Sequence, residues 1–295
     1  MFLTLKMKRI VCVLSFCLAF LTTVFAKDAD SLSVKTDNEL TKNFALGMSF
    51  GSKTHHVSHL SPLLYSGNGI GLWAERINKK NWRNKDFYSL TNFRFDRSSL
   101  SYLTLTEQNI MAVSNLELDY HLYYDWKLAS NFHLLCGGYI GGEFEKNEMQ
   151  SSLWIGNNPN FYSIELNLLG LSLRPTLCIQ TNRRLIKISN QFDLRLAGFV
   201  FYPTTNQSFL CDDLKDVIDF NSFSEKIHFS DKLTVDLPLR KTTLRLGMLV
   251  ERSKSMIFNV DNRSLNVQGI VGFSFDYLTS SGRLNRKKQL KTIFE

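Results

Sequence analysis

The chain has few cysteines, five in 295 residues. Cys12 and Cys17 lie in an apolar N-terminal leader, which leaves Cys136, Cys178 and Cys211. The remaining number is odd, and the spacing matches no metal-ligand motif, so the sequence predicts neither a disulfide framework nor a cysteine-based metal site. Cys136 lies among alternating apolar residues and is interpreted as a small hydrophobic side chain.

The only long apolar run stands at the N-terminus. Lys8 and Arg9 precede "IVCVLSFCLAFLTTVFA", and the polar "KDADS" follows. This order of a basic region, an apolar region and a small residue predicts a secretory signal peptide over residues 1–26, with the mature chain beginning at Lys27. Met7 is an alternative start, because a signal peptide that begins there has the usual compact form.

No later segment offers the roughly twenty uncharged apolar residues that a membrane-spanning helix needs. Even the most apolar stretch, "FDLRLAGFVFY", carries Asp193 and Arg195. The formal charge of +8 also does not describe a basic folded surface. The leader supplies three of these charges and the tail 279–295 a net four, which leaves about +1 for the rest. A nucleic-acid partner is therefore not predicted.

From residue 41 onward, apolar and polar residues alternate with period two, which is typical of β-strands. "NFALGMSFG" and "TLRLGMLVE" each place large apolar residues on one face and small or polar residues on the other. The sequence predicts ten strands: 41–52, 68–78, 86–95, 112–126, 130–145, 161–180, 185–202, 224–237, 242–254 and 264–278. The strand 161–180 is expected to contain a bulge, because Gly170 shifts the alternation and Pro175 removes a ladder donor.

The connections between these strands alternate in length. The segments 53–67, 96–111, 146–160 and 203–223 are long, whereas 79–85, 127–129, 181–184 and 238–241 are short. This alternation is typical of a chain that crosses an outer membrane with short periplasmic turns and longer outer loops. We therefore predict an all-β, transmembrane, antiparallel up-and-down barrel of about ten strands, within a range of eight to twelve. A soluble periplasmic β-protein is the alternative, since a sandwich also alternates.

Aromatic residues crowd the ends of the predicted strands, as the interfacial girdle of a membrane barrel requires. These residues are Phe87, Tyr88, Tyr124, Trp126, Phe161, Tyr162, Phe201, Tyr202 and Tyr277. The predicted organisation is thus a leader at 1–26, a polar segment at 27–40, a barrel at 41–278 and a basic tail at 279–295.

The leader, the polar segment, the stretch "HLSPLLYSGNGIGL" and the successive amphipathic hairpins together resemble the small, uncharacterised outer-membrane barrel proteins of the Bacteroidota type. The resemblance covers most of residues 40–278 and brings no activity with it. It implies outer-membrane lipid and the barrel-assembly machinery as partners. Such barrels usually end on an aromatic residue in the last strand, whereas here the aromatic signal "GFSFDY" is internal and further residues follow Leu278.

The stretch "NLELDYHLYYDWKL", residues 115–128, sets polar and apolar side chains on strictly alternate positions. In a barrel its polar face points into the lumen. Ten strands leave little room for free water, so buried anions need cationic partners. The same parity predicts a lumenal polar network of Glu117, Asp119, His121, Asp125, Asp193, Arg195, Lys232 and Arg245. A metal or acid–base site at Asp119 and His121 is the less favoured interpretation, and no metal or cofactor is predicted.

A second candidate site lies in "THHVSHLSP". Outer-membrane lipid hydrolases pair a histidine with a serine two residues later, and His59 and Ser61 match this spacing. Their motif continues with Asn-Gly, whereas Pro62 and Leu63 follow here. The sequence therefore favours a non-enzymatic outer-membrane protein, either a surface-loop binding or envelope protein or a narrow pore. A lipid hydrolase that uses His59 and Ser61 is the alternative.

Overall fold

The computed structural model describes residues 41–58, 60–82, 85–103, 108–151, 160–181, 184–202, 218–239, 242–257 and 260–278. The predicted leader, polar segment 27–40 and basic tail lie outside the described residues. The regular elements are strands: β1 (Thr41–Val57), β2 (Tyr65–Trp82), β3 (Lys85–Leu103), β4 (Gln108–Ala129), β5 (Phe132–Ser151), β6 (Asn160–Thr181), β7 (Arg184–Phe201), β8 (Ile218–Ser222), β9 (Lys226–Pro238), β10 (Thr243–Ile257) and β11 (Val260–Leu278). In this described part of the chain, no helix is long and apolar enough to cross a bilayer.

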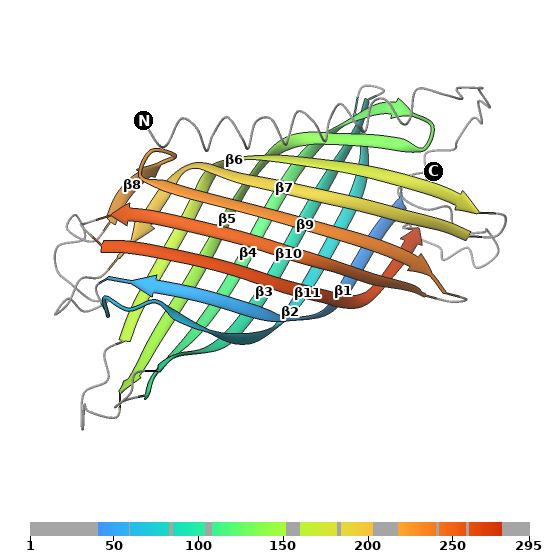
Figure 1. The fold of residues 1–295 in the computed structure, drawn as a ribbon. Coiled ribbons are helices and arrows are strands. Elements are labelled where there is room, and N and C mark those ends of the chain that lie inside the picture. The colour runs from blue at the N-terminus through green and yellow to red at the C-terminus, as the bar shows by residue number, and fades with distance from the viewer. Residues whose placement is uncertain are drawn as a thin grey trace, which may run out of the picture.

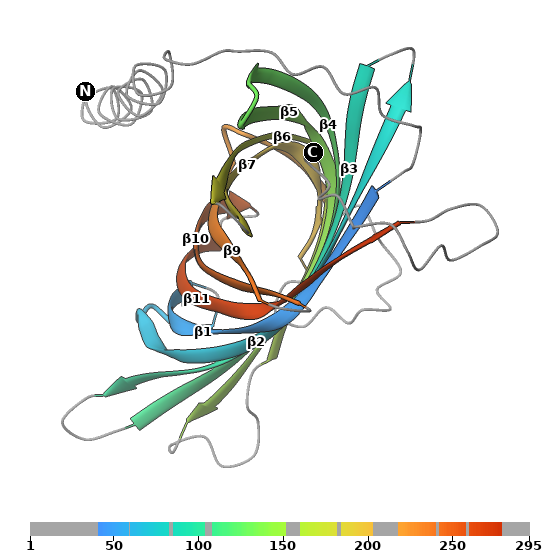
Figure 2. The ribbon, with the colours of Figure 1, turned by 90° about the vertical axis from the view of Figure 1, so that its right-hand side faces the viewer.

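The strands close into one antiparallel barrel (Figures 1 and 2). Neighbours follow the order β6-β5-β4-β3-β2-β1-β11-β10-β9-β7, and β6 pairs with β7 to complete the ring. The short β8 pairs with residues 197–201 of β7, whereas β9 pairs with residues 187–194 of the same strand. β8 and β9 therefore form one strand position that is interrupted at 223–225. The predicted all-β antiparallel barrel with ten strand positions is confirmed.

The barrel has two different ends. We call the end where β2–β3, β4–β5, β6–β7 and β9–β10 are joined the turn end, and the opposite end the loop end. Most strands run further toward the loop end than predicted: β3 and β4 pair as far as Leu103 and Gln108, and β4 and β5 as far as Asn109 and Ser151. In the β3 extension the exposed outer face carries Arg97, Ser99 and Ser101, whereas Leu100 is buried inside, so the apolar-outward pattern is lost while the backbone ladder continues.

The bulge predicted in the strand 161–180 is present in β6. Leu168 and Leu169 both face outward, and the pairing with β7 shifts register between Asn167 and Gly170. Gly170 suits this position because a Cβ there would lie 2.1 Å from the ring of Tyr139. The bulge thus makes room for a large aromatic side chain that reaches across from β5.

The same irregularity corrects one predicted face of β7. The sequence pattern places Gly198 and Val200 on the outer, apolar face, but Val200 is fully buried in the lumen and Phe199 faces outward instead. At the register shift, β7 has one extra residue between Arg195, which pairs with Gly170, and Ala197, which pairs with Leu169. An odd insertion exchanges the two faces of a strand from that point on, because side chains alternate with period two.

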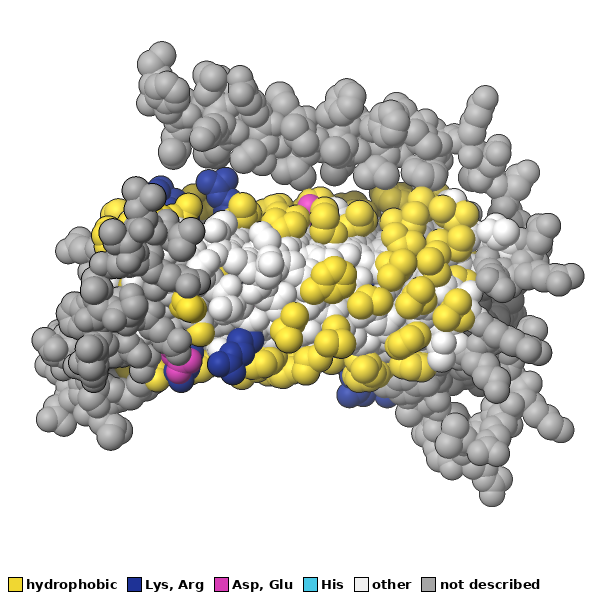
Figure 3. All heavy atoms as spheres, turned by 60° about the horizontal axis from the view of Figure 1, so that its bottom comes forward, with side chains coloured by type: hydrophobic (Ala, Val, Ile, Leu, Met, Phe, Trp, Pro, Cys, Tyr) yellow, Lys and Arg dark blue, Asp and Glu magenta, His cyan; other side chains and the backbone are white. Residues whose placement is uncertain are grey.

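Large apolar side chains gather over much of the outer surface of the barrel, beside a region of small and polar side chains (Figure 3). Every long strand contributes large apolar side chains that are more than a third exposed, among them Phe44, Leu46, Met48, Phe50, Ile70, Leu72, Phe93, Leu116, Leu118, Leu122, Ile140, Leu166, Leu171, Leu233, Met248, Val271 and Phe273. An apolar surface of this extent is unusual on a water-soluble monomer. A polar pair lies within it, since Asp231 stands between Phe229 and Leu233 and is hydrogen-bonded by Asn190.

The predicted aromatic girdle is only partly on the outer face. Trp126 is half-exposed on the outside, and Phe87 and Tyr124 stack edge to face beside it. Tyr88, Phe161 and Tyr202, in contrast, are buried in the lumen, where they were not expected. When two aromatic residues are adjacent in a strand, the alternation sends one of them inward, and the pairs 87–88, 161–162 and 201–202 all follow this rule.

Candidate functional site

Many charged side chains of the described barrel lie inside it. The lumen holds eight basic side chains, Lys53, Arg94, Arg174, Lys187, Arg195, Lys226, Lys232 and Arg245, and eleven carboxylates, Glu75, Asp96, Glu117, Asp119, Asp125, Glu143, Glu145, Glu165, Asp193, Asp236 and Glu251. They alternate along the strands with the apolar residues of the outer face. The eight residues of the predicted lumenal network all lie among them or, in the case of His121, beside them.

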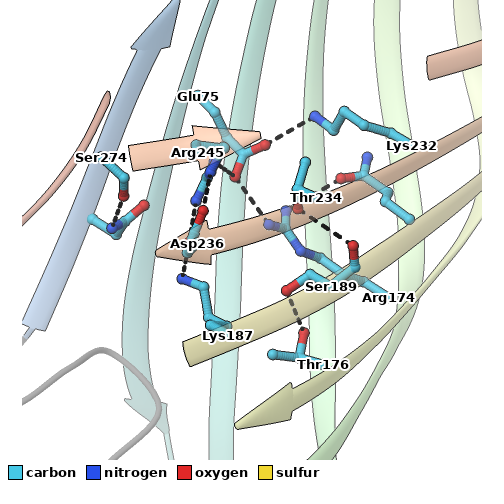
Figure 4. Close-up of polar contacts among 12 residues, drawn as sticks. Glu75, Arg174, Thr176, Lys187, Ser189, Lys232, Thr234, Asp236, Arg245 and Ser274 are labelled. Atoms are coloured by element: carbon cyan, nitrogen blue, oxygen red, sulfur yellow. Dashed lines mark hydrogen bonds and ion pairs between the residues drawn. The ribbon is translucent and has the colours of Figure 1, made fainter. Parts of the chain in front are cut away.

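A cluster nearer the turn end is organised by Glu75 of β2 (Figure 4). The Glu75 carboxylate accepts ion pairs from Arg174 at 3.0 Å, Arg245 at 2.9 Å and Lys232 at 2.9 Å. These cations come from β6, β10 and β9, so the contacts cross the lumen between walls that are distant in the ring. Glu75 is 1% exposed, and three cations offset the cost of burying its charge.

Asp236 of β9 extends the cluster toward the neighbouring strands. Arg245 donates to both of its carboxylate oxygens, at 2.6 and 2.9 Å, which is the bidentate geometry that an arginine fork favours. Lys187 lies 3.0 Å from the same carboxylate. Arg245 therefore holds two anions at once, Glu75 across the lumen and Asp236 beside it.

A second cluster in the middle of the lumen is organised by two arginines. Arg94 of β3 reaches Glu117 and Glu251 at 2.6 Å each. Arg195 of β7 reaches Glu117 at 2.7 Å and Glu165 at 3.0 Å, and it also pairs with Glu143. Glu117 of β4 thus joins the two arginines, and ion pairs extend across the lumen from β3 and β10 to β5, β6 and β7.

Asp119 differs from the other predicted network residues. It makes no ion pair within 4 Å with any residue that the structure describes, and its Oδ1 accepts no hydrogen bond there. The carboxylate packs over the backbone of β5 at Gly141, where a Cβ would lie 1.9 Å from Oδ1. The absence of a side chain at Gly141 therefore makes the space that Asp119 fills.

His121 sits within an aromatic group. Its ring stacks on Tyr139, with centroids 4.8 Å apart, and on Tyr123, with centroids 5.6 Å apart. Its Nδ1 lies 3.2 Å from the Tyr123 hydroxyl and 3.7 Å from Asp193. The histidine is fully buried, so it is placed as a packed hydrogen-bonding residue rather than at an accessible surface.

Asp125 lies closer to the turn end than the rest of the predicted network. Its carboxylate is 3.0 Å from Nδ1 of His133, and both side chains are buried. The structure therefore brings Glu117 and Arg195 together, and likewise Lys232 and Arg245 through Glu75. Asp125 belongs to a separate pair.

One group of lumenal side chains has the composition of a metal site. Ligand atoms of Glu117, His228 and Glu251 all lie within 4.8 Å of one another, and the three residues are buried. Arg94, however, bonds both carboxylates at 2.6 Å. The guanidinium already supplies the positive charge that these carboxylates need, so the geometry favours an ion-pair cluster here.

Apolar layers lie at both ends of the charged lumen. At the turn end, the layer consists of Ile77, Tyr88, Leu90, Tyr123, Leu135 and Cys178, with Leu185 packed against it. At the loop end, one cluster contains Val57, Phe161, Val200 and Tyr202, and another contains Tyr65, Leu100, Met111 and Val113. Leu60 packs against both loop-end clusters, so the segment after β1 folds inward over the lumen.

Ser61 of the hydrolase alternative lies in that inward segment. It is buried, and its Oγ accepts hydrogen bonds from the Tyr65 hydroxyl at 3.3 Å and the backbone N–H of Leu63 at 3.2 Å. His59 lies outside the described residues. The hydroxyl therefore serves the turn that covers the lumen, and no described histidine contacts it.

Several network residues were not singled out from the sequence, chiefly Glu75, Arg94, Arg174, Glu143, Glu165, Lys226 and Glu251. The alternation of apolar and polar residues could have identified most of them, because they stand on the polar face of a predicted strand. Glu251 shares the inner face of β10 with Arg245, for example. Arg174 was harder to assign, since the β6 bulge shifts the alternation a few residues before it.

Solved structures with similar chain paths are outer-membrane barrels. The outer-membrane protease OmpT from Escherichia coli has a TM-score of 0.46 and 10% identity, covering 84% of this chain and 99% of that one. The translocator domain of autotransporter NalP from Neisseria meningitidis has a TM-score of 0.39 and 12% identity, covering 92% and 97%. No curated protein matches. The family model described as "Protein of unknown function (DUF3316)" matches residues 11–283, and the chain belongs to this family.

Proposed function

We propose that this chain is an outer-membrane barrel with a sealed lumen, which acts through the surface at its loop end as a binding or envelope-structural protein. The observation that carries the proposal is the distribution of polarity. The outer face is apolar, whereas charged residues fill the inside and pair with one another. A barrel in lipid requires this inside-out arrangement, and a soluble barrel would require the opposite one.

The closed lumen argues against the narrow pore that the sequence left open. Ion pairs cross the lumen at two levels, at Glu75 and at Glu117. Two cavities lie within the lumen, and Arg94, His228 and Glu251 line both. These three residues therefore separate the two cavities, and the apolar layers close the lumen at its two ends. Ions would have to break buried ion pairs to pass.

The hydrolase alternative receives no support from the described geometry. A serine nucleophile needs an adjacent base and access to substrate. Ser61 is buried, and its hydroxyl oxygen accepts hydrogen bonds from the turn that holds it. Outer-membrane lipid and the barrel-assembly machinery remain the proposed partners, since a barrel with this outer face has to be inserted and solvated by lipid.

Four measurements test the proposal. Cell fractionation should recover the protein with the outer membrane, and the folded protein in detergent should migrate differently on a gel before and after boiling. Recovery in the soluble periplasm would favour the soluble alternative instead. Purified protein in planar bilayers should give no stepwise conductance, and regular single-channel steps would support the narrow pore. Release of fatty acid that Ser61→Ala abolishes would support the hydrolase.

A further inference from the structure

A group of basic side chains lies on the outer face of the barrel near the loop end. Arg252 and Lys254 of β10 and Arg263 of β11 are exposed. They point outward, because their neighbours Ser253, Asn262 and Ser264 line the lumenal space. We call Arg252, Lys254 and Arg263 the basic row.

Positive charges face each other within this row. Lys254 stands directly opposite Arg263 in the β10–β11 ladder. Like charges placed opposite each other on one face of a sheet are destabilising, and side chains at such positions lie close together. The arrangement therefore favours an anion that several of these side chains can share.

One carboxylate of the chain contributes to this surface. Asp261 pairs with Arg263, whose Nε lies 2.9 Å from Oδ1. The hydrogen bond from Arg263 lowers the pKa of the Asp261 carboxyl, and the charges of Arg263, His56 and Lys254 lower it further. Arg252 and Lys254 make no ion pair with any residue in the described ranges. The row thus keeps an excess of positive charge after Asp261 is counted.

Exposed apolar side chains surround the basic row. Ile227 stands opposite Lys254 on β9, and Leu265 stands opposite Arg252 on β11. Met256 follows Lys254 on the same face of β10, and these three apolar residues are 42 to 59% exposed. A ligand that fits here carries both an anionic group and hydrocarbon, which is the chemistry of a phosphorylated lipid.

We propose that the basic row binds the phosphate group of a lipid in the outer leaflet, while the acyl chains of that lipid lie on the apolar surface of β9, β10 and β11. This inference rests on the proposed membrane location, because the row meets lipid phosphates only if the apolar band beneath it lies in the bilayer. The cations contribute charge-assisted hydrogen bonds to phosphate oxygens.

Native mass spectrometry of the purified full chain in detergent tests the site with three probes. These are a lipid A that carries phosphate, the same lipid after dephosphorylation, and inorganic phosphate. The wild-type protein should retain the phosphorylated lipid and release the other two. The double variant Arg252→Gln/Lys254→Gln should bind the phosphorylated lipid at least about tenfold more weakly, since a hydrogen bond to a charged group typically contributes a factor of this size or more.

Two further variants control the test. Arg97→Gln removes an exposed arginine from the outer face of β3, away from the row, and should leave binding unchanged. Asp261→Asn removes the competing carboxylate and should tighten binding, which supplies a second readout if the double variant folds poorly. Equal binding by wild type and the double variant would overturn the site. So would equal retention of the dephosphorylated lipid, and inorganic phosphate binding as tightly as the lipid would overturn the lipid assignment. Cell fractionation tests the membrane location separately.

Discussion

Glu75→Gln should weaken the barrel more than its single-atom change suggests. The substitution keeps the shape of a side chain that is 1% exposed but removes the charge that three cations share. Arg245 retains Asp236 as a partner. Among the described residues, Arg174 retains only the neutral Gln191, at 3.2 Å, and Lys232 loses the one ion pair that it makes.

The size of the effect follows from these leftover charges. Removing one partner of a buried ion pair costs about 3–5 kcal/mol, because the other charge stays buried without compensation. In Glu75→Gln both Arg174 and Lys232 stay buried without an anionic partner, so we expect the free energy of unfolding to fall by an amount in the upper part of that range. Adding Lys232→Met to Glu75→Gln removes one of the stranded charges and should recover part of the lost free energy of unfolding.

The assay is equilibrium unfolding by denaturant in detergent, followed by tryptophan fluorescence and by heat-modifiable gel migration. Glu148→Gln is the matched control, because Glu148 pairs with Lys146 on the outer face and both side chains are about 30% exposed. An exposed pair of this kind contributes about 0–1 kcal/mol. If Glu75→Gln and Glu148→Gln lower stability equally, the ion pairs that cross the lumen do not hold the barrel together.

Four further substitutions test the two faces of the barrel wall and the packing between strands. Leu118→Arg, at a position 55% exposed on the apolar band, should cost about 2–4 kcal/mol near the bilayer midplane and reduce membrane-inserted protein, whereas Asp119→Asn, which faces the lumen, should leave insertion nearly intact. Gly170→Ala places a Cβ against the ring of Tyr139 and should cost about 1–3 kcal/mol in denaturant unfolding, as overpacking usually does. Asp231→Leu removes a polar group from the apolar band and should raise the denaturant midpoint in lipid vesicles.

Each of these has a contrary outcome. Equal insertion of Leu118→Arg and Asp119→Asn would mean that the two faces do not meet different solvents. A neutral Gly170→Ala would show that the Tyr139 ring moves away easily. Gly269→Ala is its control, because a Cβ there comes no closer than 3.3 Å to any atom, the nearest being in the ring of Phe50. A lower midpoint for Asp231→Leu would indicate that Asp231 has a partner on the outside.

The fold was readable from the sequence because a membrane barrel repeats one rule, apolar outward and polar inward, along every strand. The rule located ten strand positions, and it placed the polar side chains of residues 115–125 in the lumen. The prediction was less accurate where a register shift exchanges faces, as at Val200, and toward the loop end, where the outer face becomes polar and apolar residues such as Leu100 turn inward. Periodicity is read along a single strand, whereas a bulge depends on how two strands pair, so the pattern of one strand does not locate it.

The pairing within the lumen could not be predicted in the same way. The sequence placed Arg195, Lys232 and Arg245 on the inner face, but which carboxylate each one meets depends on strand tilt and register around the ring. Glu75 and Arg174 are separated by 99 positions in the chain and meet only because β2 and β6 face each other across the lumen. Such contacts follow from closure of the barrel, which no single stretch of sequence contains.

The interrupted strand position has a consequence for motion. β8 pairs with β7 over five residue pairs, whereas β9 ends its ladder with β10 at Lys226 and Ser255. Beyond that point, one backbone hydrogen bond from Met256 to Glu225 holds β10 against the turn at 223–225 in the described chain. Local opening needs the least free energy where few backbone bonds must break. Amide hydrogens of β8 and the loop end of β10 should therefore exchange with solvent before those of β4 and β5. Unfolding of the barrel wall should begin between β8 and β10.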